Sequence, residues 1–98
     1  MPYTIETVDG KTTMKIDESL TIYDVPALHE AFVNCFESGG GITVDVRSVT
    51  ECDPAGLQLL CAVRKHTREN RELFQVLGES KAIMDALNYL GLKSDDII

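Results

Sequence analysis

The sequence predicts an α/β (α+β) fold, with a small mixed β-sheet of four to five strands and helices packed on one face. An alternating hairpin pattern opens the chain, and apolar residues recur at helical spacing in three later segments with short apolar strands between them. A parallel pair of strands needs a long crossover connection, which is usually a helix, whereas an antiparallel pair can be joined by a tight turn. Strands separated by helices are therefore expected to pair largely in parallel. The 98 residues are expected to form a single domain, residues 1–98.

The first segments are a hairpin and a helix. Residues 3–8 and 12–16 alternate in character around Asp9-Gly10, the pair that type I′ turns prefer because both positions need positive φ. From Asp24 the period becomes helical, and Gly39-Gly40-Gly41 ends the run. The apolar face of this predicted helix comprises Val25, Leu28, Phe32, Cys35 and Phe36.

The second half continues the same alternation. Residues 42–46 and 73–77 read as strands, and between them Asp53-Pro54 opens a helix that is apolar nearly all round for two turns. Ser80 caps a third predicted helix that ends at Gly91, and residues 95–98 add a short last strand. The apolar face of the third helix comprises Ile83, Met84, Leu87 and Leu90.

Charge restricts the partners. Sixteen acidic and nine basic residues give a net charge of -7, which works against binding to nucleic acid or anionic lipid. No apolar run approaches the ~20 residues that span a bilayer, so we expect a cytoplasmic protein without direct membrane insertion. Acidic residues dominate positions 17–53, whereas residues 64–71 are basic and are interpreted as a solvated helix end.

No residue pattern predicts catalysis, a metal or a cofactor. Cys35, Cys52 and Cys61 lack zinc-site spacing and are interpreted as small buried hydrophobic residues. His29 and His66 also lack metal-ligand spacing, and His29 is expected to be partly buried beside the apolar helix face. Cys52 is a poor nucleophile, because a carboxylate at the next residue raises the pKa of a thiol.

The most unusual local sequence is Asp53-Pro54-Ala55-Gly56-Leu57, which follows a strand and a turn. A capping aspartate followed by small residues places a helix N-terminus at the surface with little side-chain cover. Glycine at position 56 lets another backbone approach closely. From these residues alone, an ordinary capped helix start is an equally good interpretation.

This motif resembles that of the STAS domain, a family named for sulphate transporters and anti-sigma factor antagonists. The family motif is Asp-Ser-Ser-Gly-Leu or Asp-Thr-Ala-Gly-Leu, so Asp53, Gly56 and Leu57 match it. The resemblance covers essentially the whole chain, including residues 19–22, 42–46 and 87–92 in the family's order. It implies the family's mixed sheet, with helices on one face.

In family members of the antagonist type, partner switching regulates bacterial transcription: the domain binds an anti-sigma kinase until the second motif serine is phosphorylated. Ala55 stands at that serine, so this switch cannot operate there. The resemblance implies a non-catalytic signal-transduction module that binds an anti-sigma or histidine-kinase type partner with a basic docking surface. The expected partner-binding residues are Tyr23, Asp24, Thr50, Glu51, Asp53, Pro54, Ala55, Gly56, Leu57 and Gln58.

The sequence leaves alternative functions and partners open. A phospho-regulated antagonist would use Thr50 or Ser48 as its acceptor. A cytosolic STAS subunit of an intermembrane lipid-transport ATP-binding-cassette complex has no strict need for the motif serine. The Asp-x-Ala-Gly-Leu-Gln form weakly favours a chemosensory kinase as partner, and a homodimer is a further alternative.

Overall fold

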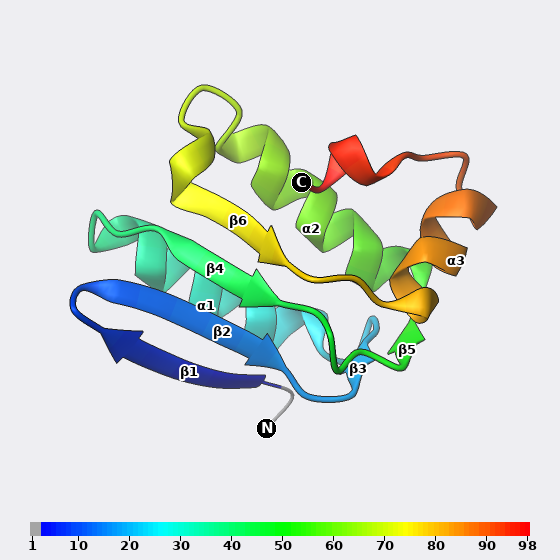
Figure 1. Cartoon of the computed structure of the whole chain (residues 1–98), viewed down its shortest axis with the longest axis horizontal. Coiled ribbons are helices and arrows are strands. Elements are labelled where there is room, and N and C mark those ends of the chain that lie inside the picture. The colour runs from blue at the N-terminus through cyan, green and yellow to red at the C-terminus, as the bar shows by residue number, and fades with distance from the viewer. Residues whose placement is uncertain (1–2) are drawn as a thin grey trace.

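The computed structural model describes residues 3–98 and shows a four-stranded mixed sheet, with helices behind it (Figure 1). The strand order is β1-β2-β4-β6. Strand β1 (Tyr3–Val8) runs antiparallel to β2 (Lys11–Ile16), whereas β2, β4 (Ile42–Asp45) and β6 (Phe74–Leu77) are parallel. The mixed sheet expected from the sequence is confirmed.

The hairpin forms as its turn residues predict. Asp9 and Gly10 have φ values of 52° and 78°, and they join Val8 directly to Lys11 in an unbroken antiparallel register. Positive φ at both central positions is the requirement of a type I′ turn, which matches the twist of the two strands. The turn therefore sets which backbone amide and carbonyl groups of β1 point towards β2 and which point towards the free edge of the sheet.

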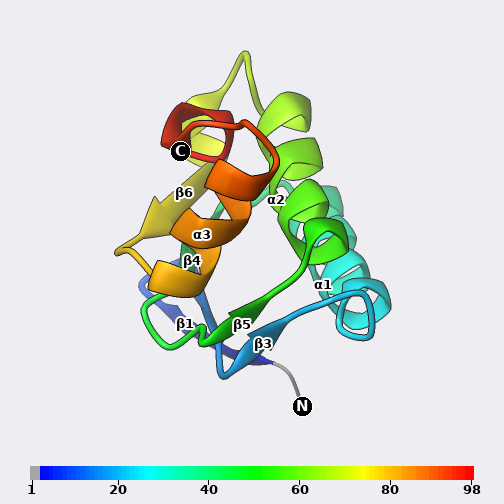
Figure 2. The same ribbon diagram turned by 90° about the vertical axis from the view of Figure 1, so that its right-hand side faces the viewer.

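Helices α1 (Val25–Glu37) and α2 (Pro54–His66) cover one face of the sheet, and α3 (Lys81–Tyr89) lies at the end where the parallel strands terminate (Figures 1 and 2). Phe32 from α1 and Phe74 from β6 meet edge to face with ring centroids 6.0 Å apart. The largest fully buried side chains also include those of Met14, Ile16, Leu20, Leu28, Leu57, Leu60 and Leu87.

Two elements differ from expectation. Strands β3 (Ser19–Leu20) and β5 (Glu51–Cys52) pair in parallel as a second small sheet that the sequence did not predict, because two residues are too short for a periodic signal. The last strand predicted at residues 95–98 is wrong: Ser94–Asp96 is a 3₁₀ turn. Asp96 accepts a hydrogen bond from the Lys93 backbone at 2.7 Å, and such local bonds favour a turn.

The basic end of α2 is not fully solvated. Arg64 is only 7% exposed and donates to the carbonyl oxygens of Phe74 and Ile97 and to the hydroxyl of Thr67. Its guanidinium lies 4.9 Å from the centre of the Phe74 ring. Arg64 thus fastens the C-terminal segment and β6 to α2, a structural role that charge patterning alone did not indicate.

The third helix begins as predicted but buries less of its apolar face. Ser80 accepts a hydrogen bond from the Ile83 amide and donates to the Val49 carbonyl at 2.6 Å. Ile83 and Leu87 are buried, whereas Met84 is 39% exposed. The expectation of a buried Met84 was therefore wrong, because this nine-residue helix has its inner face filled by the other two side chains.

Candidate functional site

The candidate site lies at the carboxyl ends of the parallel strands. Strand β2 leads through β3 to α1, β4 leads through β5 to α2, and β6 leads to α3. All three connections therefore reach the same end of the sheet, where the N-terminus of α2 stands between its neighbours (Figure 2). Binding sites of sheets with parallel strands commonly form at this end, because the connecting segments converge there.

Asp53 holds two segments of the site together. Its Oδ1 accepts the Gly56 amide at 2.8 Å, which caps α2, and its Oδ2 accepts the Ile22 amide at 2.9 Å, across 31 residues of chain. The capping predicted from the sequence is confirmed. Both carboxylate oxygens are engaged within the chain, so substituting Asp53 would disturb the fold as well as any contact with a partner.

Gly56 and Leu57 lie beneath the surface rather than on it. A Cβ at position 56 would stand 2.0 Å from the Leu20 carbonyl oxygen, so the close backbone approach expected at this glycine is made by β3 of the same chain. Leu57 is fully buried. Among the expected partner-binding residues, these two therefore support the surface from below, Gly56 by admitting β3 and Leu57 by anchoring in the core.

Asp24, at the start of α1, organises the turn beside the motif. Its Oδ2 accepts hydrogen bonds from the hydroxyls of Ser19, at 2.7 Å, and Thr21, at 3.0 Å, and from the Thr21 amide, at 3.0 Å. Burial alone would raise the pKa of Asp24, but these hydrogen bonds outweigh it and keep the pKa below its ordinary value of 3.8. The ionised carboxylate therefore shapes the turn that carries Tyr23.

We expect Asp24→Asn to be less stable than the unmodified chain by about 1 kcal/mol at neutral pH, because an amide accepts the same hydrogen bonds more weakly. The folded-state pKa is lowered, so the carboxylate contributes stability above about pH 3.8 that is lost as the pH falls through the folded-state value. Urea unfolding of both proteins from pH 7 to pH 2.5 measures this difference. A constant difference throughout would contradict the assignment.

The exposed side chains around the N-terminus of α2 form a surface that we call the motif face. Tyr23 is 92% exposed and Tyr89 is 83% exposed, and a hollow of about 520 Å³ extends from β5 and the start of α2 to α3. Tyr89 lines this hollow, whereas Tyr23 lies in the turn that Asp24 organises. The motif face comprises Ile22, Tyr23, Thr50, Glu51, Pro54, Ala55, Gln58, Asp85 and Tyr89.

Helix α3 was missing from the sequence-based site. Asp85 and Tyr89 both line the hollow opposite Pro54. Tyr89 lies outside the apolar stripe of α3. This position off the stripe is the sequence signal that could have marked it as an exposed aromatic residue. Only the tertiary structure brings α3 beside a motif that lies some thirty residues earlier in the chain.

The motif face is acidic. Glu51 and Asp85 are exposed at the hollow, and of the described residues that line it, none is basic. Thr50 is also exposed there, and its hydroxyl donates to the Glu18 carbonyl at 3.3 Å, whereas Ser48 is half-buried. The acidic character extends across both β5 and α3, so it is a property of the surface and not of one segment.

The thiol beside the motif is unsuited to nucleophilic chemistry. Burial, and to a smaller extent the Asp53 carboxylate, raises the pKa of Cys52 to about 11. Cys35 and Cys61 also have raised pKa values, mainly through burial. All three are half-buried free thiols, somewhat more accessible than the sequence suggested. Within residues 3–98, no three His, Cys, Asp or Glu side chains cluster as metal ligands would.

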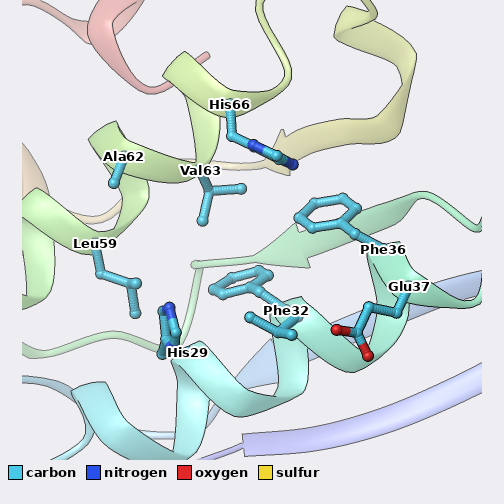
Figure 3. Close-up of a pocket in the computed structure, with 9 residues that line it drawn as sticks. His29, Phe32, Phe36, Glu37, Leu59, Ala62, Val63 and His66 are labelled. Atoms are coloured by element: carbon cyan, nitrogen blue, oxygen red, sulfur yellow. The ribbon is translucent and has the colours of Figure 1, made fainter.

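A second hollow, apolar and about 470 Å³ in volume, runs between α1 and α2 away from the motif (Figure 3). Phe32, Val63 and Leu59 form its floor, and the Phe36 and His66 rings lie 5.8 Å apart at one end. His29 is exposed here, contrary to the partial burial expected from its position. This groove holds neither the motif residues nor the exposed tyrosines.

Comparison with known proteins gives a family and a fold. A sequence model of the family described as "Mlab, STAS domain" matches residues 4–98. No curated protein sequence matches the chain significantly. In residues 3–98, no helix has the length and apolar character needed to cross a bilayer.

Solved structures share the fold at low sequence identity. An anti-sigma factor antagonist from Mycobacterium paratuberculosis is 22% identical with a TM-score of 0.68, covering 91% of this chain and 76% of that one. The unphosphorylated anti-sigma factor antagonist SpoIIAA is 12% identical with a TM-score of 0.69, covering 89% and 82%. Mglu is 10% identical with a TM-score of 0.66, and the match covers 80% of this chain but only 20% of Mglu.

Proposed function

The chain belongs to the STAS domain family, and from that premise we propose that it is a non-catalytic module that binds a regulatory protein in the cytoplasm through the motif face. The observation that carries the proposal is a pair of exposed tyrosines near the capped N-terminus of α2: Tyr23 follows Ile22, whose amide donates to Asp53, and Tyr89 lines the hollow with Pro54. Tyrosine is enriched among the residues that dominate binding energy at protein interfaces, because a large rigid side chain is buried at low entropic cost.

The geometry of the site supports recognition by a folded surface. Asp53 and Gly56 hold β3, the turn before α1 and the start of α2 together, so the exposed residues above them are presented on a rigid base. A rigid surface loses little conformational entropy on binding. Ala55, at the serine position of the antagonists, is half-exposed and has no acceptor hydroxyl. We therefore propose an anti-sigma or histidine-kinase type partner that is bound without phosphorylation at this position.

The acidic motif face should attract a partner with a basic docking surface. We expect Glu51→Lys combined with Asp85→Lys to slow association about tenfold at low ionic strength, because both carboxylates lie exposed at the hollow. The effect should fade above about 0.5 M salt, where screening is strong. Stopped-flow association kinetics across a salt series measure it. Equal rates for the two proteins at low salt would show that the partner is not steered by this surface.

In a second candidate function, the chain is a permanently bound STAS subunit of an intermembrane lipid-transport ATP-binding-cassette complex. Ala55 favours it, since a chain without the acceptor serine suits a constitutive assembly. A phospho-regulated antagonist using Thr50 or Ser48 is distinguished from both, because incubation with its kinase and ATP would add the mass of one phosphate. An unchanged mass would exclude that alternative.

Affinity purification from the native cell, followed by mass spectrometry, tests the proposed function. The unmodified chain and the Glu51→Lys/Asp85→Lys variant should be used side by side as baits. Recovery of an anti-sigma or histidine kinase by the first bait and its loss with the second would support the proposal. Recovery of a transport ATPase would support the second candidate instead. Recovery of the same proteins by both baits would contradict the motif face as the docking surface.

A further inference from the structure

The free edge of the main sheet is unprotected at β1. Within residues 3–98, only β2 pairs with this strand, and the register from Tyr3 to Val8 runs without a bulge. Its sequence, YTIETV, is rich in residues that favour strands and holds a single charge, Glu6. Edge strands of soluble proteins usually carry lysine, proline, a bulge or a covering segment, because free backbone groups invite another strand. Strand β1 has no such feature within residues 3–8.

The hairpin turn determines which backbone groups are free. In a two-residue turn the flanking residues, Val8 and Lys11, are a hydrogen-bonded pair, and such pairs alternate along an antiparallel ladder. The amide and carbonyl groups of Glu6 and Thr4 therefore also point towards β2. Those of Tyr3, Ile5 and Thr7 point outwards, which gives the edge an evenly spaced set of donors and acceptors.

The side chains at this edge complete a pattern that fits its own copy. Ile5 lies opposite the fully buried Met14, so it projects on the helix-covered side of the sheet, yet it is 45% exposed. Glu6 lies opposite Thr13 and projects on the other side. An added strand would thus cover an apolar side chain on one face and meet a single carboxylate on the other.

We propose that β1 pairs with β1 of a second copy of this chain, antiparallel and centred on Ile5, to form a continuous sheet across a homodimer. In this register Ile5 faces Ile5 of the second copy and Tyr3 faces its Thr7, and each of these pairs exchanges two hydrogen bonds through the outward groups. Glu6 faces Thr4 of the second copy, so no like charges are opposed. Centring the pair one residue later would place Glu6 against Glu6 in a close pair, which is unfavourable.

The opposite edge does not offer the same surface. Strand β6 has four residues, and the Phe74 carbonyl at that edge accepts a hydrogen bond from the buried Arg64 at 2.5 Å. The proposed dimer therefore closes after two copies instead of continuing as a fibre. It also leaves the motif face free, because that surface lies at the carboxyl ends of β2, β4 and β6, whereas the contact lies along the side of β1 (Figures 1 and 2).

Sedimentation equilibrium of the unmodified chain and two glutamate variants tests the dimer. Because the contact is small, we expect the weight-average mass to rise from that of one chain towards that of two between about 10 μM and 1 mM. Thr4→Glu sets a carboxylate opposite Glu6 of the second copy, twice per dimer, and should weaken dimerisation about tenfold. The new carboxylate lies beside Lys15 of β2 but also near Asp17, whose Oδ1 accepts from the Thr4 hydroxyl at 3.5 Å in the unmodified chain. Urea unfolding of the variant therefore accompanies the sedimentation measurement and separates a loss of stability from a loss of dimerisation.

The matched control adds the same charge away from the edge. Thr43→Glu lies on the same face of the sheet in the central strand β4 and should leave the dimerisation constant unchanged. Combining Thr4→Glu with Glu6→Lys pairs opposite charges across the contact and should restore dimerisation. An unmodified chain that stays monomeric at 1 mM, equal behaviour of Thr4→Glu and Thr43→Glu, or failure of the combined variant to recover would each overturn the proposal.

Discussion

Replacing Gly56 by alanine is expected to lower the free energy of unfolding by about 3 kcal/mol or more. The new Cβ would lie 2.0 Å from the Leu20 carbonyl oxygen and 2.5 Å from its carbon, far inside van der Waals contact. Both obstacles are backbone atoms, so relief requires β3 to move away from α2. Overpacking typically costs about 1–3 kcal/mol, and a backbone obstacle places this site at the upper end.

A matched glycine provides the control. At Gly40 an added Cβ would have its nearest neighbours at 3.7 Å and beyond, which is ordinary contact. Gly40→Ala should therefore change the free energy of unfolding by less than about 1 kcal/mol. Urea denaturation of the two variants compares them directly. Similar stabilities for both would show that the contact between Gly56 and Leu20 does not hold the motif in place.

Replacing Ala55 by aspartate is expected to weaken binding to the partner by at least about 2 kcal/mol, or about thirtyfold, while leaving the fold intact. Position 55 lies in the first turn of α2, where a carboxylate interacts favourably with the helix dipole, so the free chain should be no less stable. In the complex, the same carboxylate would be desolvated in an interface that is already acidic on this side. Isothermal titration calorimetry measures the loss.

The control for this prediction is the same substitution two turns further along the helix. Ala62 is exposed and lies between the α1/α2 groove and a further hollow that Gln58 also lines, one turn beyond the last residue of the motif face on α2. Ala62→Asp should bind the partner within about twofold of the unmodified chain. If the two aspartate variants lost affinity equally, net charge would explain the effect and the position of Ala55 would not.

Local signals predicted most of the fold because each element has its own periodicity or cap. The Asp9-Gly10 turn, the Asp53 cap and the Ser80 cap each depend on residues within three or four positions of one another. The small sheet of β3 and β5 has no such signal. Its two strands are short, and they pair only because the chain returns to Leu20 after some thirty residues.

The sequence predicted the motif at the centre of the candidate site but not the residues of other segments that surround it. The motif around Ala55 could be found from residue order, but whether a motif residue reaches the surface depends on packing against other segments. Leu20 covers Gly56, and α3 brings Tyr89 to the opposite side of the hollow. Burial of Arg64 has the same kind of cause, since its hydrogen-bond partners at Phe74 and Ile97 are distant in the sequence.

We expect the motif face, and not the apolar groove between α1 and α2, to receive the partner. Two-dimensional NMR of the chain, labelled with ¹⁵N and titrated with the purified partner, tests it most directly. We expect the largest amide shift changes in residues 22–24, 50–58 and 85–89, with little change in the groove around Phe36 and His66. Shifts centred on the groove, with residues 50–58 unchanged, would contradict the claim.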